Sequence, residues 1–171
     1  MKNVFLIGFM GCGKSSVAAH LSKTYGMDVL EMDQVIIERV GMSIADIFTQ
    51  YGETYFRDIE TELVKEIQHK DNQVVSCGGG IVLRTQNVDT MRSAGTIVCL
   101  TAKPETILER VKDDDARPLL KGNKNLTFIN EMMEKRRNKY ECAADIIVET
   151  DGKTIAEICD EIVAYMKWQE R

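Results

Sequence analysis

The chain has 171 residues, of which 44% are hydrophobic and 29% are charged, which is ordinary for a globular protein. Its 22 basic and 27 acidic residues give a net charge of -5, which argues against a protein that binds nucleic acid or an anionic membrane surface. Two prolines and 12 glycines give no support to disordered or fibrous classes, so we expect one domain over residues 1–171.

The cysteines and the apolar segments bear on the compartment. The five cysteines are widely spaced and include no CxxC pair, which argues against a disulfide framework and a thiolate zinc site. No segment approaches the roughly 18 consecutive apolar residues needed to cross a bilayer. We expect a cytoplasmic monomer that binds neither membrane nor nucleic acid.

Short apolar runs alternate along the chain with longer segments of helical periodicity. Such runs are typical of buried strands in a parallel sheet whose two faces are covered by the intervening helices. The expected strands are 4–7, 29–32, 74–77, 97–100 and 146–148, and the expected helices include 15–25, 53–68, 105–112, 126–141 and 154–168. The sequence therefore predicts an α/β fold, a three-layer sandwich with a five-stranded parallel sheet.

A phosphate-binding motif follows the first expected strand. Residues 8–15 read Gly-Phe-Met-Gly-Cys-Gly-Lys-Ser and match GxxxxGK[ST], between an apolar strand and an amphipathic helix, as the motif requires. In such a loop backbone N–H groups and the helix N-terminus hold phosphate oxygens, Lys14 reaches the terminal phosphates, and the Ser15 hydroxyl binds Mg²⁺. We expect Cys12 to fill a position that needs a small side chain.

The loop alone is compatible with ATPases, GTPases and small-molecule kinases. GTPases carry a base-reading NKxD motif, and residues 123–126, Asn-Lys-Asn-Leu, lack its aspartate. GTPases are therefore disfavoured. A kinase also needs an acceptor pocket with a carboxylate that orients or deprotonates the attacking hydroxyl.

Two acidic residues end the second expected strand. Glu31 and Asp33 are two positions apart, so on a strand both side chains would face the crevice beside the phosphate loop. This placement suits an acceptor pocket. The alternative is that Asp33 caps a helix that starts at Gln34.

The expected helix 53–68 carries a candidate anion-binding residue. Apolar side chains at positions 56, 59, 63 and 67 form one stripe along this helix. Arg57 and Glu60 lie away from the centre of that stripe. Since Glu53 and Glu60 both lie within a helical turn of Arg57, the spacing leaves a surface ion pair and a functional role as alternatives.

Two further segments suit ligand contact. Three consecutive glycines, 78–80, follow the third expected strand, where backbone amides can approach a ligand without hindrance from side chains. Residues 113–125 combine an acidic run with Pro118 and Gly122, and suit either a loop that closes over bound nucleotide or an ordinary acidic surface loop.

Together these residues resemble the shikimate kinases, P-loop small-molecule kinases related to nucleoside monophosphate kinases. The resemblance covers nearly the whole chain, and the order and spacing of its motifs are jointly specific. The motifs are GxxGxGKS at 8–15, SIADIF at 43–48, GExxFRxxE at 52–60, SCGGG at 76–80, RPLL at 117–120 and a Lys-Arg pair at 135–136. The resemblance implies a P-loop fold of the nucleoside monophosphate kinase type, with ATP-dependent phosphorylation of the 3-hydroxyl of shikimate in aromatic amino acid biosynthesis.

The resemblance also implies roles for individual residues. Lys14, Asp33 and Arg117 would take part in catalysis, and Glu60 would hold Arg57 in place. A substrate-binding region would extend over about residues 33–60 and a lid over about 113–125. The ATP site would comprise Gly11, Cys12, Gly13, Lys14, Ser15, Ser16, Arg110 and Arg117, and the shikimate site would comprise Asp33, Arg57, Gly79, Gly80 and Arg136.

One position departs from the family pattern. The family usually carries Asp-x-Asp at the end of the second strand, and here the first residue is Glu31. Its longer side chain can still reach Mg²⁺ through a bound water, so Ser15 and Glu31 are the expected metal-site residues. The alternatives are another small-acceptor kinase, such as a gluconate or nucleoside monophosphate kinase, and a nucleotide-binding domain without turnover.

Overall fold

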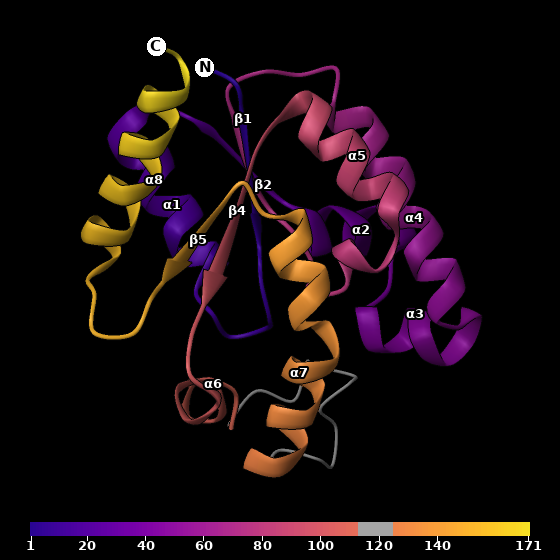
Figure 1. The fold of residues 1–171 in the computed structure, drawn as a ribbon. Coiled ribbons are helices and arrows are strands. Elements are labelled where there is room, and N and C mark those ends of the chain that lie inside the picture. Colours follow the sequence, from indigo (N-terminus) through magenta and orange to yellow (C-terminus); the bar gives the residue numbers. More distant parts are fainter. Residues whose placement is uncertain (113–124) are drawn as a thin grey trace.

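A computed structural model describes residues 1–112 and 125–171 (Figure 1). Within these residues five parallel strands form one sheet in the order β2-β3-β1-β4-β5. The predicted α/β class and the parallel sheet are confirmed, and the strand bounds shift by only one or two residues. The strands are β1 (Asn3–Ile7), β2 (Asp28–Glu31), β3 (Gln73–Ser76), β4 (Gly95–Thr101) and β5 (Ile146–Glu149).

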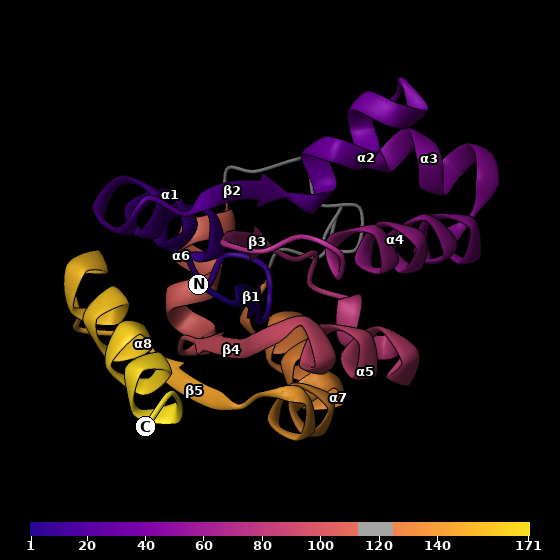
Figure 2. The ribbon, with the colours of Figure 1, turned by 90° about the horizontal axis from the view of Figure 1, so that it is seen from above.

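Helices cover both faces of this sheet, which makes the predicted three layers (Figure 2). One face carries α1 and α8, which pack against each other, while α4, α5 and α7 lie on the other face. The helices are α1 (Lys14–Tyr25), α2 (Met32–Val40), α3 (Ile44–Tyr51), α4 (Glu53–Ile67), α5 (Thr85–Ala94), α6 (Pro104–Val111), α7 (Leu126–Ala143) and α8 (Ile155–Gln169), with a 3-10 helix η1 (Ile81–Leu83).

The central strand β1 brings the important loops to one edge of the sheet. Every residue of β1 is buried because the strand has neighbours on both sides and helices on both faces. Its register sets Val4 opposite Val74 of β3 and Thr96 of β4, so the three carboxyl ends lie close together. Ligands of open parallel sheets bind outside these ends, where the phosphate loop and the glycine segment 78–80 begin.

The chain after β2 differs from the sequence prediction. β2 ends at Glu31 and α2 begins at Met32, so Asp33 lies in the first helical turn and not on the strand. The prediction that Glu31 and Asp33 share one face of a strand was therefore wrong. The alternative that Asp33 caps a helix from Gln34 was also wrong, because Glu31 occupies the N-cap position. Met32, which is fully buried, anchors this strand-to-helix turn in the core.

The predicted lid over residues 113–125 falls almost entirely outside the described residues, and so does Arg117. Asn125 is described, and its side chain accepts a hydrogen bond from the Phe128 N–H at 2.9 Å, which caps α7. In the described part of the chain no helix has both the length and the apolar character to span a membrane. All five cysteines are free thiols.

Candidate active site

A cavity of about 210 Å³ opens at the carboxyl ends of β1, β2 and β3. Three segments that are far apart in the sequence line it: the phosphate loop with the start of α1, the turn from β2 into α2, and the end of β3 with the glycine segment. The structure thereby brings most of the predicted site residues together. The lining residues are Gly11, Gly13, Lys14, Ser15, Ser16, Glu31, Asp33, Ser76, Cys77, Gly78 and Gly79.

The phosphate loop has the backbone conformation that its glycines allow. Gly11 and Gly13 adopt left-handed φ angles of 80° and 99°, which side chains with a Cβ rarely tolerate. Gly13 is the N-cap of α1 and provides no capping side chain, so the helix N-terminus can offer its N–H groups to an anion. Lys14 Nζ donates to the carbonyl oxygens of Gly8 at 2.7 Å and Phe9 at 3.2 Å, which keeps the ammonium over the loop.

Two side chains contact the loop without lining this cavity. Cys12 is 1% exposed and its Sγ lies 3.7 Å from Lys14 Nζ, so it fills a small core position, as predicted. Its side chain borders a separate cavity of about 460 Å³. Arg110 Nη1, from α6, donates to the Gly11 carbonyl at 2.9 Å. The predicted nucleotide residue Arg110 therefore does lie at the loop.

The two expected metal-site residues are in direct contact. The Ser15 hydroxyl donates to Glu31 Oε2 at 3.1 Å, and both residues line the cavity. Hydroxyl and carboxylate oxygens are the ligands that Mg²⁺ prefers. Among the described residues there is no group of three or more His, Cys, Asp or Glu side chains that could hold a metal ion. Ser15 and Glu31 are thus residues that would suit a Mg²⁺ ion at the phosphate loop.

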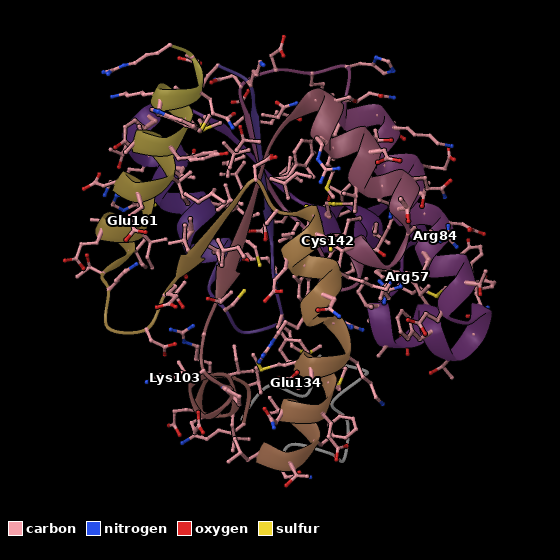
Figure 3. All side chains as sticks on the ribbon, in the orientation of Figure 1. Arg57, Arg84, Lys103, Glu134, Cys142 and Glu161 are labelled. Atoms are coloured by element: carbon pink, nitrogen blue, oxygen red, sulfur yellow. The ribbon has the colours of Figure 1, made fainter. Side chains whose placement is uncertain are left out.

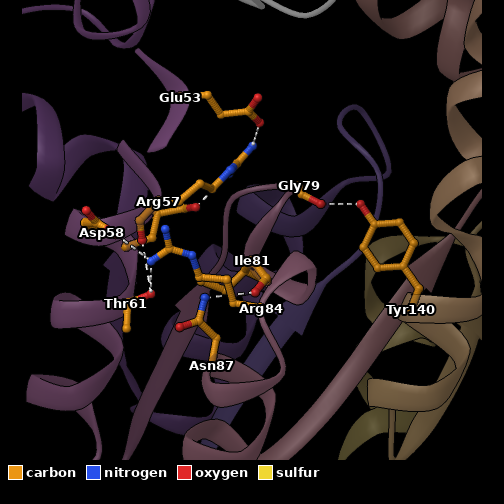
Figure 4. A network of polar contacts seen from close by, with 10 residues as sticks. Glu53, Arg57, Asp58, Thr61, Gly79, Ile81, Arg84, Asn87 and Tyr140 are labelled. Carbon is orange, nitrogen blue, oxygen red and sulfur yellow. Dashed lines mark hydrogen bonds and ion pairs between the residues drawn. The ribbon is translucent and has the colours of Figure 1, made fainter. Parts of the chain in front are cut away.

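Arg57 and Glu60 of α4 form a buried ion pair. Their Nη1 and Oε1 atoms are 2.6 Å apart, and Arg57 Nη2 also donates to Glu53 Oε1 at 3.0 Å (Figure 4). Glu60 is fully buried and Arg57 is 7% exposed. Arg57 and Glu60 lie outside the apolar stripe of α4, but the glycine segment packs against them and buries them. The alternative of a surface ion pair was therefore wrong.

The charges around Glu60 make it titrate near neutral pH. Burial raises the pKa of Glu60 to about 7, although the Arg57 guanidinium lowers this pKa by favouring the carboxylate. Two weaker effects oppose each other, because Asp33 raises the pKa and Arg136 lowers it. Burial works against the charge of Arg57, but its carboxylate partners outweigh burial and raise the pKa of the guanidinium. Arg57 is therefore a fixed cation beside a carboxyl group that can lose its charge.

We expect this raised pKa of Glu60 to give a measurable pH dependence of stability. A carboxyl with a raised folded-state pKa adds stability below its usual pKa of 4.5, and this contribution is lost as the pH rises to about 7. Between about pH 5 and pH 8 the wild-type free energy of unfolding should fall by about 2 kcal/mol more than that of Glu60→Gln. Urea unfolding at both pH values measures this difference.

Glu62→Gln is the matched control, because Glu62 lies on the same helix but is exposed and pairs with Lys65 at 2.7 Å. This variant should lose as much stability as the wild type over the same pH range. Equal losses in the wild type and Glu60→Gln would mean that Glu60 titrates at an ordinary pKa.

Two buried arginines meet at the glycine segment. A Cβ at Gly79 would lie 3.5 Å from Arg136 Nη1, and a Cβ at Gly80 would overlap the Arg57 guanidinium. Arg136 is 8% exposed, and its buried Nη1 has no hydrogen-bond partner within the described residues. Arg57, Gly80 and Arg136 do not line the 210 Å³ cavity, but Gly79 does; Arg136 lies beside Gly79, and Arg57 lies against Gly80. Cations from α4 and α7 thus converge on one short segment, which suits a carboxylate ligand.

Asp33 lies beside the glycine segment and lines the same cavity as the phosphate loop. A Cβ at Gly78 would lie 3.1 Å from Asp33 Oδ1 and 2.8 Å from Glu60 Oε2. Asp33 lines the cavity together with Lys14 and Ser15. The Asp33 carboxylate therefore shares one cavity with the phosphate loop and the glycine segment.

The sequence analysis did not predict the side chains that hydrogen-bond to the backbone of the glycine segment and the residue after it. Tyr140 donates to the Gly79 carbonyl, and Asn87 Nδ2 donates to the Ile81 carbonyl at 3.0 Å (Figure 4). Arg84, which lies beside Arg57 (Figure 3), pairs with Asp58 of α4 at 2.8 Å. The spacing of Arg136 and Tyr140, four residues apart on one helical face, was the available signal for Tyr140.

Known proteins that are similar to this chain are shikimate kinases. The sequence model of the shikimate kinase family matches residues 10–167. Shikimate kinases from Thermodesulfovibrio yellowstonii and Persephonella marina are 43% and 41% identical, over 95% and 98% of this chain and 94% and 100% of their own lengths. A solved shikimate kinase from Acinetobacter baumannii in complex with shikimate has a TM-score of 0.93 at 28% identity, and the match covers 99% of this chain and 94% of that one.

A more distant structure shares the fold alone. Deoxyadenosine kinase from M. mycoides has a TM-score of 0.62 at 14% identity, over 96% of this chain and 99% of that one. With the strand order 2-3-1-4-5, this confirms the predicted fold of the nucleoside monophosphate kinase type. Since the family match spans nearly the whole chain, the protein belongs to the shikimate kinase family, whose members use ATP to phosphorylate shikimate in aromatic biosynthesis.

Proposed function

We propose that this chain transfers the γ-phosphoryl group of ATP to the 3-hydroxyl of shikimate, with ATP at the phosphate loop and shikimate at the glycine segment. The observation that carries the proposal is the meeting of Arg57 and Arg136 at consecutive glycines, on the border of the same cavity that the phosphate loop lines. A phosphate site with a carboxylate site directly beside it is what a kinase for a carboxylic acid needs.

The arginines would fix the acceptor by its carboxylate. A planar guanidinium can donate two parallel hydrogen bonds to a carboxylate, and two such groups define the orientation of a small acid. Gly79 and Gly80 would add backbone N–H donors. Orientation matters because phosphoryl transfer is in line, so the hydroxyl held nearest the phosphate is the one that reacts.

Asp33 and Lys14 would act on opposite sides of the transferred group. Asp33 would orient the 3-hydroxyl and accept its proton. Lys14 would stabilise charge on the transferring phosphoryl group, which supplies most of the catalysis in this type of reaction. Arg110 would flank the adenine. Arg117 would contact the ATP phosphates from a lid over 113–125. Both statements remain predictions from the family resemblance, because Arg117 and nearly all of the lid lie outside the described residues.

We also propose that Ser15 and Glu31 hold Mg²⁺, Ser15 directly and Glu31 through water. When bound, the ion neutralises charge on the phosphates. Glu31→Ala should raise the Mg²⁺ concentration for half-maximal activity roughly tenfold, the lower end of the cost of losing such an outer partner. A Mg²⁺ titration measures this, with the exposed Glu38 of α2 changed to alanine as the control. An unchanged Mg²⁺ requirement in Glu31→Ala would exclude this role.

The proposed function is tested by the acceptor preference of the purified chain. ADP release from Mg²⁺-ATP should depend on shikimate, and gluconate or nucleoside monophosphates should not replace it. Mass spectrometry and NMR of the product should place the phosphate on the 3-hydroxyl. A preference for gluconate would favour the rival small-acceptor kinase, and nucleotide binding without turnover would favour a non-catalytic domain.

We propose further that the enzyme is a cytoplasmic monomer. A reducing compartment that supplies ATP is consistent with five free cysteines. A site whose described residues all come from one chain does not require a second copy. Sedimentation at working concentrations and cell fractionation test these two statements.

A further inference from the structure

Tyr140 of α7 holds the glycine segment from the side opposite Arg57. The residue is 7% exposed, and its hydroxyl donates a hydrogen bond to the Gly79 carbonyl, 61 residues away in the sequence (Figure 4). Burial raises the pKa of Tyr140 above its usual value, although the Arg136 guanidinium opposes this. The hydroxyl therefore keeps its proton at neutral pH and remains a donor.

Among the three glycines, the carbonyl of Gly79 differs from the other two in its hydrogen-bond donor. The carbonyl groups of Gly78 and Gly80 each accept from the backbone N–H three residues further along, at 3.1 Å. The carbonyl of Gly79 instead accepts from Tyr140. Because glycines have wide conformational freedom, the orientation of the Gly79–Gly80 peptide depends on this bond from another element.

That orientation decides where the Gly80 N–H points. No cis peptide occurs among the described residues, and in a trans peptide the C=O and N–H groups point in opposite directions. With the Gly79 carbonyl drawn toward α7, the Gly80 N–H points away from α7, to the side on which Arg57 lies. Gly80 is packed so closely on the Arg57 guanidinium that a Cβ there would overlap it.

We propose that Tyr140 is a positioning residue for the acceptor: by holding the Gly79–Gly80 peptide, it directs the Gly80 N–H toward the shikimate molecule beside Arg57. The proposal rests on the proposed function, in which these glycines contact shikimate. Tyr140 acts through the peptide and not on the reacting atoms. Loss of its hydroxyl should therefore weaken shikimate binding and leave the nucleotide side unchanged.

Tyr140→Phe is the direct test, since it keeps the ring and removes only the donor. We expect the KM for shikimate to rise about five- to tenfold, as for the net loss of one hydrogen bond, with kcat and the KM for ATP within about twofold of wild type. Tyr25→Phe is the matched control, because Tyr25 also donates one hydroxyl hydrogen bond, to Asp160 at 3.3 Å between α1 and α8. The control should leave both KM values unchanged.

Amide hydrogen exchange provides a second readout that does not depend on activity. In Tyr140→Phe the amides of residues 78–81 should exchange faster, while those of α1 should not change. An unchanged KM for shikimate, an equal rise in both KM values, or equal protection of residues 78–81 in the two proteins would each overturn the proposal. A wild-type protein without shikimate-dependent turnover would instead reject the proposed function, and the exchange result would still judge the Tyr140 contact.

Discussion

Asp33→Asn should lose phosphoryl transfer by about a hundredfold to ten-thousandfold in kcat while retaining ATP binding, as expected when a general base is removed. Asparagine has nearly the size of aspartate and can still orient a hydroxyl, but it cannot accept its proton. Asp33 lines the cavity beside Lys14 and Ser15 and does not form part of the phosphate loop, so nucleotide affinity should change little. Steady-state kinetics and equilibrium binding of ATP measure the two quantities separately.

Asp89→Asn is a suitable control for the loss of one acidic charge. Asp89 is exposed on α5, away from the cavity lining, so this variant should keep wild-type kcat. If Asp33→Asn retained turnover within about tenfold of wild type, proton acceptance by Asp33 would be excluded. If both variants lost activity equally, the effect would come from net charge and not from the position of Asp33.

The sheet and the phosphate loop were predictable because each depends on local sequence. Short apolar runs define the parallel strands, and the GxxxxGK[ST] motif has a fixed place between a strand and a helix. The rule that ligands bind at the carboxyl ends of parallel strands then brings the loop and the glycine segment together. The roles of Arg57 and Arg136 came only from the family resemblance, because spacing alone left a surface ion pair as the alternative for Arg57.

The features that could not be predicted depend on contacts between distant segments. Glu60 is buried because the glycine segment packs against its side of α4, which helical periodicity cannot reveal. α2 begins at Met32, directly after β2, so Asp33 lies on a helix and does not continue the strand, as the sequence analysis had expected. The hydrogen bond of Tyr140 to Gly79 joins α7 to a loop that follows β3.

Replacing Arg57 should damage both substrate binding and stability, for two separable reasons. In Arg57→Met, shikimate loses a partner that can donate two charge-assisted hydrogen bonds, so its KM should rise on the order of a hundredfold or more. The same change leaves Glu60 fully buried without the cation 2.6 Å away, so its pKa should rise further above 7, and the loss of unfolding free energy should grow above neutral pH to about 2 kcal/mol at pH 9. This loss should shrink at lower pH, because Glu60 is then protonated.

The double variant Arg57→Met/Glu60→Gln separates these two effects. With no buried carboxylate left to neutralise, most of the lost stability should return, since a buried ion pair can often be replaced by uncharged groups at little cost. The KM for shikimate should stay as high as in the single variant, because the guanidinium is still missing. If the double variant instead bound shikimate as tightly as the wild type, Arg57 would serve only to neutralise Glu60, and the carboxylate of the substrate would have to be held by Arg136 without it.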